Sequence, residues 1–339
     1  MFTPTSPLIT PGGLHKQMRG NEALVAFARK VIALLGPTAV GKTALGVTLA
    51  EAIGAEIVSA DSRLLYRGMD IGTAKPTHAE RERVPHHLID ATTPDEPWDL
   101  TRWLAAATAT IADITARGKV PMIVGGTAQY TTALLDGWQP PNVPPDPAYR
   151  ALLEARAEAE GVLALVAELA VLDPEAAART GPNLRRIIRA LEVIRATGEP
   201  FSAQRGRGER PYDDLRFALT LPRDALYARI DARVDAQIAA GLVDEVRSLL
   251  AAGYAPPMPA MSGIGYAQVL EYLEDTKTLH EVMENIRYAT HRYARHQQTW
   301  LRRESSAILL DMTDPARAYE EAVQHVTTFY NPRRTETTG

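Results

Sequence analysis

The sequence predicts an α/β fold in which a parallel sheet with flanking helices is interrupted by an inserted, all-helical domain. Two patterns indicate this. In the first third of the chain, short apolar runs alternate with segments whose apolar residues recur at helical spacing, which is typical of parallel strands joined by crossover helices. Residues 148–197 then show Ala, Leu, Glu and Arg at a helical period and no strand signal. A helical stretch of that length between strand regions indicates an insertion.

The expected strands and helices of the first third follow one another in a regular order. Three strands and two helices are predicted, namely strands Val31–Leu35, Glu56–Ala60 and Val120–Val124 and helices Thr43–Ile53 and Asp99–Arg117. Because a helix separates successive strands, neighbouring strands are expected to run parallel. Beyond the insertion, we expect Phe217–Leu221 to rejoin the sheet as a strand, followed by helices at 223–252 and 277–303.

The boundaries of the predicted domains follow from composition. The proline-rich tract 139–147 separates the two parts. We expect a core domain formed by 30–139 and 209–315, and a helical insertion at 140–208. Residues 1–29 mix Pro, Gly and scattered basic residues without an apolar export segment, so a poorly ordered leader is expected there. A C-terminal tail is expected at 316–339.

The composition of the 339 residues excludes several classes of protein. Hydrophobic residues make up 45% and charged residues 23%, which is ordinary for a globular protein. No apolar run approaches the roughly 18–20 residues that a membrane span needs, so no membrane association is expected. The chain has no cysteine, which excludes disulfides and zinc sites built from cysteine. Both observations fit a cytoplasmic location.

Positive charge is unevenly distributed along a chain whose net charge is −4. Residues 179–210 contain eight Arg and three Glu, and residues 285–303 contain five Arg, two His and no acidic residue. One such run is often only a solvated helix face. Two of them in an acidic protein favour a polyanionic partner such as nucleic acid.

The segment Gly36–Thr43 matches the phosphate-binding P-loop. It follows a predicted strand and begins a predicted helix, as the motif requires. Its glycines let backbone amides surround phosphate oxygens, Lys42 would contact the terminal phosphates, and Thr43 would bind Mg²⁺. The expected phosphate-binding residues are Gly36, Pro37, Thr38, Ala39, Val40, Gly41, Lys42 and Thr43.

The core is therefore expected to be P-loop NTPase-like. The motif alone does not decide between nucleotide hydrolysis, a small-molecule kinase and another phosphate chemistry.

A carboxylate, Asp61, follows the second predicted strand. In a parallel sheet this position lies at the same edge as the P-loop, which follows the first strand. From its position alone, Asp61 could hold Mg²⁺, cap a helix or act as a general base. The third strand ends in Gly125-Gly126 rather than in an acidic residue, which argues against a motor-type NTPase.

Sequence motifs spread over residues 31–303 resemble the signatures of the tRNA dimethylallyltransferases. They occur in the order typical of that family, at Asp61–Pro76, Val84–Asp90, Gly125–Tyr130, Arg186–Val193, Gly263–Tyr266, Tyr293–Arg295 and Gln298–Trp300. The resemblance implies an enzyme that binds tRNA, flips out the adenosine adjacent to the 3′ side of the anticodon, and transfers a dimethylallyl group from dimethylallyl diphosphate to N6 of that adenine. It also implies a monomer that uses Mg²⁺.

The resemblance implies specific roles for individual residues. Thr38 to Thr43 would hold the diphosphate, with Thr38 among the catalytic residues. Asp61 would accept the N6 proton, and Arg233 would neutralise the leaving pyrophosphate, with Arg229 as the alternative. The implied tRNA contacts are Asp61, Ser62, Arg63, Leu64, Thr127, Arg150, Arg185, Arg186, Ile187, Ile188, Arg189, Ser262, Gly263, Ile264, Gly265, Tyr266 and Ala267. Ala267 stands where relatives often have a basic residue, and Gly181–Arg185 also departs from their pattern.

Three further expectations concern side-chain surroundings. On a helical wheel the basic residues of 287–303 fall on one half, which suits a helix that is packed on one side and faces phosphates on the other. Tyr293 and Trp300 are expected in the core, and Tyr288 is the better candidate for stacking on a base. His86 and His87 are adjacent in a short strand, so a packed, hydrogen-bonded pair is favoured over a metal site.

Three alternatives to a tRNA-modifying transferase remain open. An adenylate prenyltransferase would share the P-loop and Asp61 but would use free AMP or ADP, and it would need neither the helical insertion nor the basic C-terminal helix. A P-loop kinase would need ATP turnover. A non-catalytic RNA-binding module would have no use for Lys42, Thr43 and Asp61.

Overall fold

The computed structural model describes residues 29–331 apart from Pro97 and Arg205. The leader predicted for residues 1–29 lies almost wholly outside this range, as do the last residues of the predicted tail. The chain forms two compact units, one from residues 135–211 and the other from the flanking segments up to Leu134 and from Tyr212. The expected insertion at 140–208 lies within the first of these. Within the described residues no helix has the length and apolarity to cross a bilayer.

The larger unit is built on a six-stranded parallel sheet with the order β3-β2-β4-β1-β7-β8. Its strands are β1 (Lys30–Leu35), β2 (Ala55–Ala60), β3 (His86–His87), β4 (Val120–Gly125), β7 (Asp213–Thr220) and β8 (Ile308–Asp311). In the register of the central strands, Gly125 is paired with both Leu35 and Ala60. The carboxyl ends of β1, β2 and β4 therefore meet at one edge, which confirms the predicted α/β fold with a parallel sheet.

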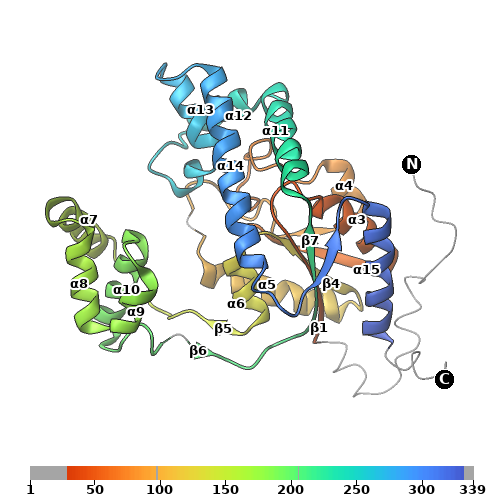
Figure 1. Cartoon of the computed structure of the whole chain (residues 1–339), viewed down its shortest axis with the longest axis horizontal. Coiled ribbons are helices and arrows are strands. Elements are labelled where there is room, and N and C mark those ends of the chain that lie inside the picture. The colour runs from red at the N-terminus through yellow and green to blue at the C-terminus, as the bar shows by residue number, and fades with distance from the viewer. Residues whose placement is uncertain (1–28, 97, 205, 332–339) are drawn as a thin grey trace. The chain divides into compact units, whose positions relative to one another are not determined.

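Helices cover both faces of this sheet (Figure 1). On one face α3 (Lys42–Ile53) packs against α15 (Pro315–Tyr330). On the other face α5 (Leu100–Ala116) lies on β2 and β4. Further along the chain are the shorter helices α4 (His78–Arg83) and α6 (Ala128–Leu135). Residues 316–330, expected as part of a tail, instead form α15, because the buried side chains of Ala318, Ala322 and Val326 complete the core under α3.

A second group of helices in the same unit has its own apolar core. It comprises α11 (Arg223–Ala239), α12 (Leu242–Ala251), the short 3₁₀ helix η1 (Pro259–Ser262), α13 (Tyr266–Leu273) and α14 (Leu279–Leu301). Val246, Val269 and Val282 are fully buried in this core. The helix predicted at 223–252 is broken at Gly241, whose φ of +98° lies in the left-handed region that a helix interior excludes. The helix predicted at 277–303 is confirmed.

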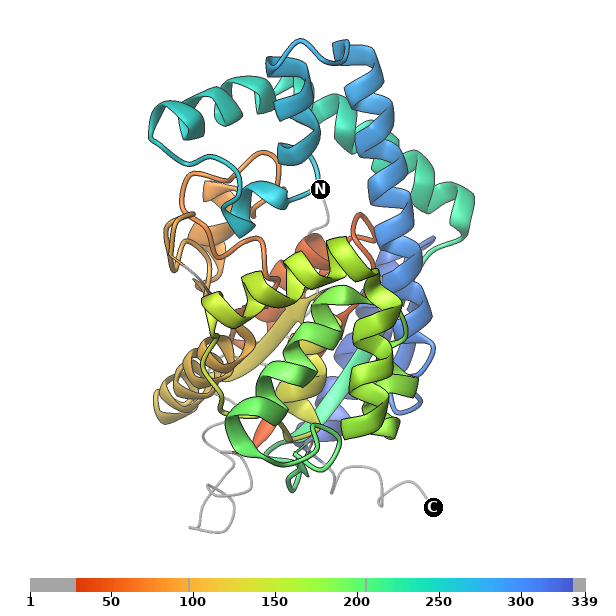
Figure 2. The same cartoon turned by 90° about the vertical axis from the view of Figure 1, so that its left-hand side faces the viewer.

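The smaller unit contains the helical insertion that the sequence predicts, together with one short strand pair (Figure 2). Its helices are α7 (Pro147–Glu160), α8 (Val162–Leu172), α9 (Pro174–Thr180) and α10 (Leu184–Thr197). Both α7 and α9 begin with an Asp that caps the helix and a Pro in the first turn, a combination that suits a helix start. A two-residue ladder pairs β5 (Trp138–Gln139) with β6 (Gly206–Arg207).

Candidate active site at the carboxyl edge of the sheet

The P-loop connects β1 to α3 and contains a buried ammonium group. Lys42 Nζ donates hydrogen bonds to the carbonyl oxygens of Gly36 (2.9 Å) and Pro37 (2.7 Å). Gly41 precedes the helix with a φ of +109°, a conformation that side chains rarely tolerate. The loop therefore has the strand–loop–helix geometry that directs backbone amides and a helix N-terminus at a phosphate.

Two of the predicted phosphate-binding residues, Ala39 and Val40, have buried side chains. Their side chains are 7% and 0% exposed and belong to the main apolar core, so neither side chain is available to a diphosphate. Ala39 also has a φ of +64°, in the left-handed region that non-glycine residues seldom adopt. The physical reason is that the loop must reverse direction at Ala39 while its apolar side chains anchor it to the core. Any contribution of Ala39 and Val40 to phosphate binding is therefore limited to their backbone amides.

The electrostatic surroundings of Lys42 connect it to two other predicted site residues. Burial lowers the pKa of the Lys42 ammonium to about 8, and Asp61 opposes this shift while Arg233 reinforces it. An effect of this kind requires the three charged groups to be near one another. The structure thus brings together the predicted phosphate ligand, base and leaving-group cation.

The position of Asp61 is fixed by the loop that leaves β2. Its Oδ1 accepts a hydrogen bond from the amide of Arg63 at 2.9 Å, which closes a short turn. The next amide, of Ser62, donates to Thr127 Oγ1 at 3.1 Å, and the amide of Thr127 donates to the carbonyl of Ala60. The ends of β2 and β4 are therefore joined directly, and Asp61 lies at the same edge of the sheet as the P-loop.

Helix α11 brings two arginines to the P-loop in different ways. Arg233 Nη1 donates to Thr38 Oγ1 at 3.3 Å, so its guanidinium lies on the side chain of a loop residue. Burial lowers the pKa of Arg233 from its usual value. Arg229 donates instead to the backbone carbonyls of Val40 (3.2 Å) and Met312 (3.4 Å). Arg229 therefore fastens the loop to the segment that follows β8, and Arg233 is the one directed at the predicted phosphate position.

The segment after Asp61 is stabilised by a buried ammonium and a half-buried carboxylate that sequence reasoning missed. The side chain of Lys75 is 2% exposed, and its ammonium donates to the carbonyl of Tyr66 and to the carboxylates of Asp70 and Asp90. Glu245 on α12 accepts hydrogen bonds from three successive backbone amides, those of residues 70–72, at 2.8–3.1 Å. Nothing in the local sequence around Glu245 indicates this contact.

In the larger unit, the predicted tRNA contacts occupy two neighbouring segments. Ser62, Arg63 and Leu64 are half-buried. Arg63 also joins these segments, because its guanidinium donates to the carbonyl of Pro259 at 2.9 Å, next to the predicted Ser262–Ala267 loop. Tyr266 must be corrected as a contact, since its side chain is 1% exposed and its hydroxyl donates to Glu245.

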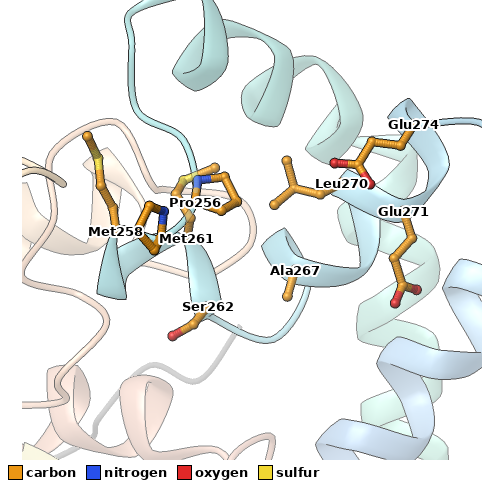
Figure 3. A pocket seen from close by; sticks show the side chains of 9 residues that line it. Pro256, Met258, Met261, Ser262, Ala267, Leu270, Glu271 and Glu274 are labelled. Atoms are coloured by element: carbon orange, nitrogen blue, oxygen red, sulfur yellow. The ribbon is translucent and has the colours of Figure 1, made fainter. Parts of the chain in front are cut away.

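A pocket of about 350 Å³ lies behind the Ser262–Ala267 loop (Figure 3). Met258, Met261 and Leu270 are among its apolar lining residues, and Glu271 on α13 and Glu274 at the end of that helix also line it. No residue of the P-loop lines it, and acidic groups would repel a phosphate. This pocket is therefore distinct from the phosphate site.

In the smaller unit, one buried carboxylate binds two of the predicted tRNA-contacting arginines. Glu192 is 2% exposed and accepts paired hydrogen bonds from Arg150 (2.8 Å) and a further one from Arg189 (2.6 Å). Burial alone would raise the pKa of Glu192, but these bonds and one from the Asp146 amide outweigh it and lower the pKa to about 2. Arg150 and Arg189 are therefore committed to an internal ion pair.

The other predicted contacts of α10 separate into exposed and buried positions. Arg185 and Arg186 are exposed in the first turn of the helix, and neither is paired with Glu192. Ile187 and Ile188 are 0% and 4% exposed and pack in the core of the unit, so their side chains are not available to tRNA. The reason is the helical period, which turns two successive apolar residues inward.

The basic face predicted for α14 is only partly free. Arg287 is paired with Asp235 and Glu284, and His291 lies 2.9 Å from Asp231 while stacking on the ring of Tyr227. These contacts attach α14 to α11. The basic residues that remain exposed are Arg292, Arg295, His296, Arg302 and Arg303, of which Arg295 donates to the Tyr227 hydroxyl.

The aromatic predictions for α14 had mixed outcomes. Tyr288 is 68% exposed, as a residue available for stacking must be. Tyr293 was expected in the core but is 38% exposed, and its ring is close enough to Asp61 and Thr127 for both to influence the pKa of its hydroxyl, which burial raises. Trp300 is half-buried.

The two adjacent histidines form the packed pair that the sequence favours. His87 Nε2 lies 2.7 Å from a carboxylate oxygen of Glu56, and His86 Nδ1 lies 2.8 Å from the carbonyl of Val84. Hydrogen bonds from Arg117 are the main reason that the pKa of Glu56 falls to about 2. Among residues 29–331 apart from 97 and 205, no group of three His, Asp or Glu side chains is arranged to hold a metal ion.

Comparison with known proteins relates this geometry to a family. The IPP transferase family model matches residues 64–304, and the isopentenyl transferase model matches residues 29–93. A tRNA dimethylallyltransferase of Roseiflexus sp. is 56% identical over 83% of this chain and 92% of its own length, and one from Thermomicrobium roseum is 50% identical over 88% and 91%.

Solved structures give the same assignment. The tRNA isopentenylpyrophosphate transferase of Bacillus halodurans superposes with a TM-score of 0.68 at 37% identity, covering 92% of this chain and all of the other. A eukaryotic dimethylallyltransferase acting on tRNA superposes with a TM-score of 0.76 at 26% identity, covering 91% and 80%. Sequence and structure agree, and the chain belongs to the IPP transferase family.

Proposed function

We propose that this protein transfers a dimethylallyl group from dimethylallyl diphosphate to N6 of the adenosine next to the anticodon of tRNA, releasing diphosphate. The observation that carries this proposal is the meeting of Lys42, Asp61 and Arg233 at one edge of the sheet. Cations on one side of the reacting carbon and a carboxylate on the other are what an alkyl transfer with an anionic leaving group requires. The family's relatives, named tRNA dimethylallyltransferases, support the choice of substrates.

The P-loop must stabilise the negative charge of the leaving group. As the bond from the allylic carbon to oxygen lengthens, negative charge accumulates on the diphosphate. Lys42, the backbone amides of Thr38–Thr43 and Arg233 would stabilise that charge, and Arg233 is already in contact with Thr38. Preorganised charges of this kind usually make the largest contribution to the rate.

Asp61 must assist a weak nucleophile, the adenine amine. An exocyclic adenine amine is weakly nucleophilic, because its lone pair is delocalised into the ring. A carboxylate that accepts an N6 proton as the new C–N bond forms removes the positive charge that would otherwise develop on nitrogen. Since Oδ1 of Asp61 already accepts the Arg63 amide, Oδ2 is the oxygen we assign to the substrate.

The residues present fit a magnesium ion that is held chiefly by the diphosphate. Thr43, the second residue of α3, is half-buried at the position where P-loops bind the ion, and no protein-only metal cluster occurs among the described residues. When bound, the ion would neutralise diphosphate charge. Thr43 would orient it from the start of the helix, and Lys42 would hold the same diphosphate from within the loop.

We assign the tRNA contacts to the exposed cations and to the loops beside Asp61. Ser62–Leu64, Thr127 and Ser262 lie near the proposed base. Gly263, Ile264 and Gly265 follow Ser262 in the same loop, and Ala267 is in the first turn of α13. Arg185 and Arg186 are the predicted cations of the smaller unit that Glu192 does not neutralise. A monomer with a cytoplasmic location, where its tRNA substrates occur, completes the proposal.

Replacing Arg185 and Arg186 together by Ala should weaken tRNA binding and reduce its salt dependence. Each phosphate contact contributes about 0.7–0.9 to the slope of log affinity against log salt, so the slope should fall by about 1–2. Filter binding at several salt concentrations measures it. Arg156→Ala is the matched control, because Arg156 is already paired with Glu168 in the same unit. An unchanged slope in the double variant would remove these residues from the interface.

Diphosphate binding should weaken as the pH rises through about 8. Lys42 is protonated below its pKa of about 8, and a bound diphosphate raises that pKa, so above pH 8 binding requires the uptake of a proton. Affinity for pyrophosphate should then fall by up to about tenfold per pH unit, and should not be weakened by this group below pH 8. Calorimetry in two buffers with different heats of ionisation measures both the affinity for pyrophosphate and the number of protons taken up on binding. Lys42→Arg should remove the fall, and a flat profile in the wild type would contradict the assignment.

The proposed function is tested by incubating the protein with dimethylallyl diphosphate and unmodified tRNA, then identifying the nucleosides by mass spectrometry. We expect N6-isopentenyladenosine at the position next to the anticodon. Product formed on free AMP but not on tRNA would indicate an adenylate prenyltransferase instead. Release of labelled γ-phosphate from ATP, with no prenyl transfer, would indicate a kinase or NTPase.

A further inference from the structure

One face of α14 reaches the three loops that form the candidate active site. Gln297 and Tyr293 are one helical turn apart on this face, and Figure 1 shows the helix running down towards α6 and the sheet. The three loops follow β1, β2 and β4, and they carry the P-loop, Asp61 and Thr127. Neither side chain has a role in the reaction as described so far.

Gln297 connects the first of these loops to the third through both ends of its carboxamide. The Oε1 atom accepts a hydrogen bond from the Thr38 amide at 2.9 Å, and Nε2 donates to the Gly126 carbonyl at 2.9 Å. The side chain is 6% exposed. The bond to Gly126 is buried and the bond from Thr38 is partly buried, so leaving either partner unpaired would cost stability.

The fit of this carboxamide depends on a glycine in the facing loop. A Cβ atom on Gly126 would lie 2.3 Å from Gln297 Nε2 and 3.0 Å from the Gly36 carbonyl. Only the absence of a side chain allows the amide to enter between the two loops. One inserted group therefore bridges the P-loop and the β4–α6 loop just beyond the ends of their paired strands.

Tyr293 extends the same connection to the loop of Asp61. Its hydroxyl lies near the side chain of Thr127, whose Oγ1 accepts the Ser62 amide. Ser62 is adjacent to Asp61, and the two side chains of α14 thus contact the segments on both sides of the space where the reaction would occur.

We propose that Gln297 is a positioning residue for the transfer reaction, and that its carboxamide fixes the P-loop relative to the loop that orients Asp61. This inference rests on the proposed function. Gln297 itself touches neither substrate. It acts on the distance between the bound diphosphate and the adenine amine, and an error of about 1 Å in such a distance can lower a rate by roughly 100-fold.

A carboxamide is the group that satisfies both loops, because it accepts through one atom and donates through the other. A carboxylate in its place would still accept the Thr38 amide but would face the Gly126 carbonyl with no proton to donate. Protonation of that carboxyl would restore the donor. The methionine side chain has similar length and can make neither bond.

The test uses Gln297→Met and Gln297→Glu in the full chain, with Gln324→Glu on the exposed face of α15 as control. We expect kcat to fall roughly 10–100-fold in both variants at about pH 8, with tRNA affinity within about twofold of the wild type. Activity of Gln297→Glu relative to the wild type should rise as the pH falls from about 8.5 to about 6, because the buried carboxyl takes up a proton. The corresponding ratio for Gln297→Met should stay constant, which a merely destabilising substitution at this position would not explain.

Hydrogen exchange at the Thr38 amide supplies a readout that needs no turnover. Exchange should be faster in Gln297→Met than in the wild type, and should remain slow in Gln297→Glu. A Met variant with kcat close to that of the wild type, or a Glu variant whose relative activity does not change with pH, would overturn the inference. A wild type that protects the Thr38 amide but transfers no prenyl group would instead refute the proposed function.

Discussion

Asp61→Asn should lower the rate of prenyl transfer by roughly 100- to 10,000-fold, the range of general-base contributions. The amide oxygen of Asn can still accept the Arg63 amide, so the turn that positions residue 61 is kept. What is lost is the charge and the capacity to take the N6 proton. Single-turnover transfer from labelled dimethylallyl diphosphate to tRNA measures the effect.

The same variant should bind tRNA within a few fold of the wild type, because the loss concerns the chemical step. Asp244→Asn is the matched control, since Asp244 is a highly exposed carboxylate on α12 whose partner is Arg247. Near-normal turnover of Asp61→Asn would show that another group accepts the proton.

Arg233→Gln should reduce kcat by about 100- to 1,000-fold, with a smaller rise in KM for dimethylallyl diphosphate. The reason is that charge on the leaving oxygen develops mainly in the transition state, so the guanidinium contributes more there than in the ground-state complex. Steady-state kinetics with saturating tRNA separate the two parameters. Arg233→Lys, which retains a point charge, should recover part of the loss.

Arg229→Gln provides the contrast on the same helix. Because Arg229 donates to the carbonyls of Val40 and Met312, its removal should lower the thermal midpoint more than Arg233→Gln does. A larger loss of kcat in Arg229→Gln, with stability unchanged, would exchange the two assignments.

The parts of the site that lie on strand ends could be predicted from the sequence. Gly36–Thr43 carries its geometry in its own glycines, and a parallel sheet brings every residue that follows a strand to one edge, so Asp61 and Lys42 were expected at the same edge. These are consequences of local pattern and topology. They require no knowledge of which helices pack together.

The contacts that depend on packing could not be predicted. A helical wheel identified the basic half of α14 but not the acidic residues Asp231 and Asp235 that face it from α11. An Arg-rich segment suggested RNA binding at Arg150 and Arg189, where a single buried Glu192 binds both. The short edge strand β8 was missed because four residues give almost no periodicity.

Within the P-loop, too, the contacts that depend on packing could not be predicted from the sequence. The motif gives no rule for its variable positions, so nothing in the pattern separates residues that offer a side chain from those that offer only an amide. Packing decides this, because the side chain of Ala39 joins the apolar core while that of Thr38 meets Arg233.

The contacts of Glu245 indicate that the proposed reaction requires helices beyond those that cover the sheet. Its carboxylate neutralises the three aligned amides of 70–72, and the Tyr266 ring closes over Gly72, where a Cβ would lie 2.5 Å from the ring. The segment that continues from Asp61 is thus held by a residue 175 positions further along the chain than Asp70. Helices α12 and α13 are scaffold for the proposed reaction centre, and a minimal enzyme trimmed to the sheet and its covering helices would lack the support that keeps the proposed base in place.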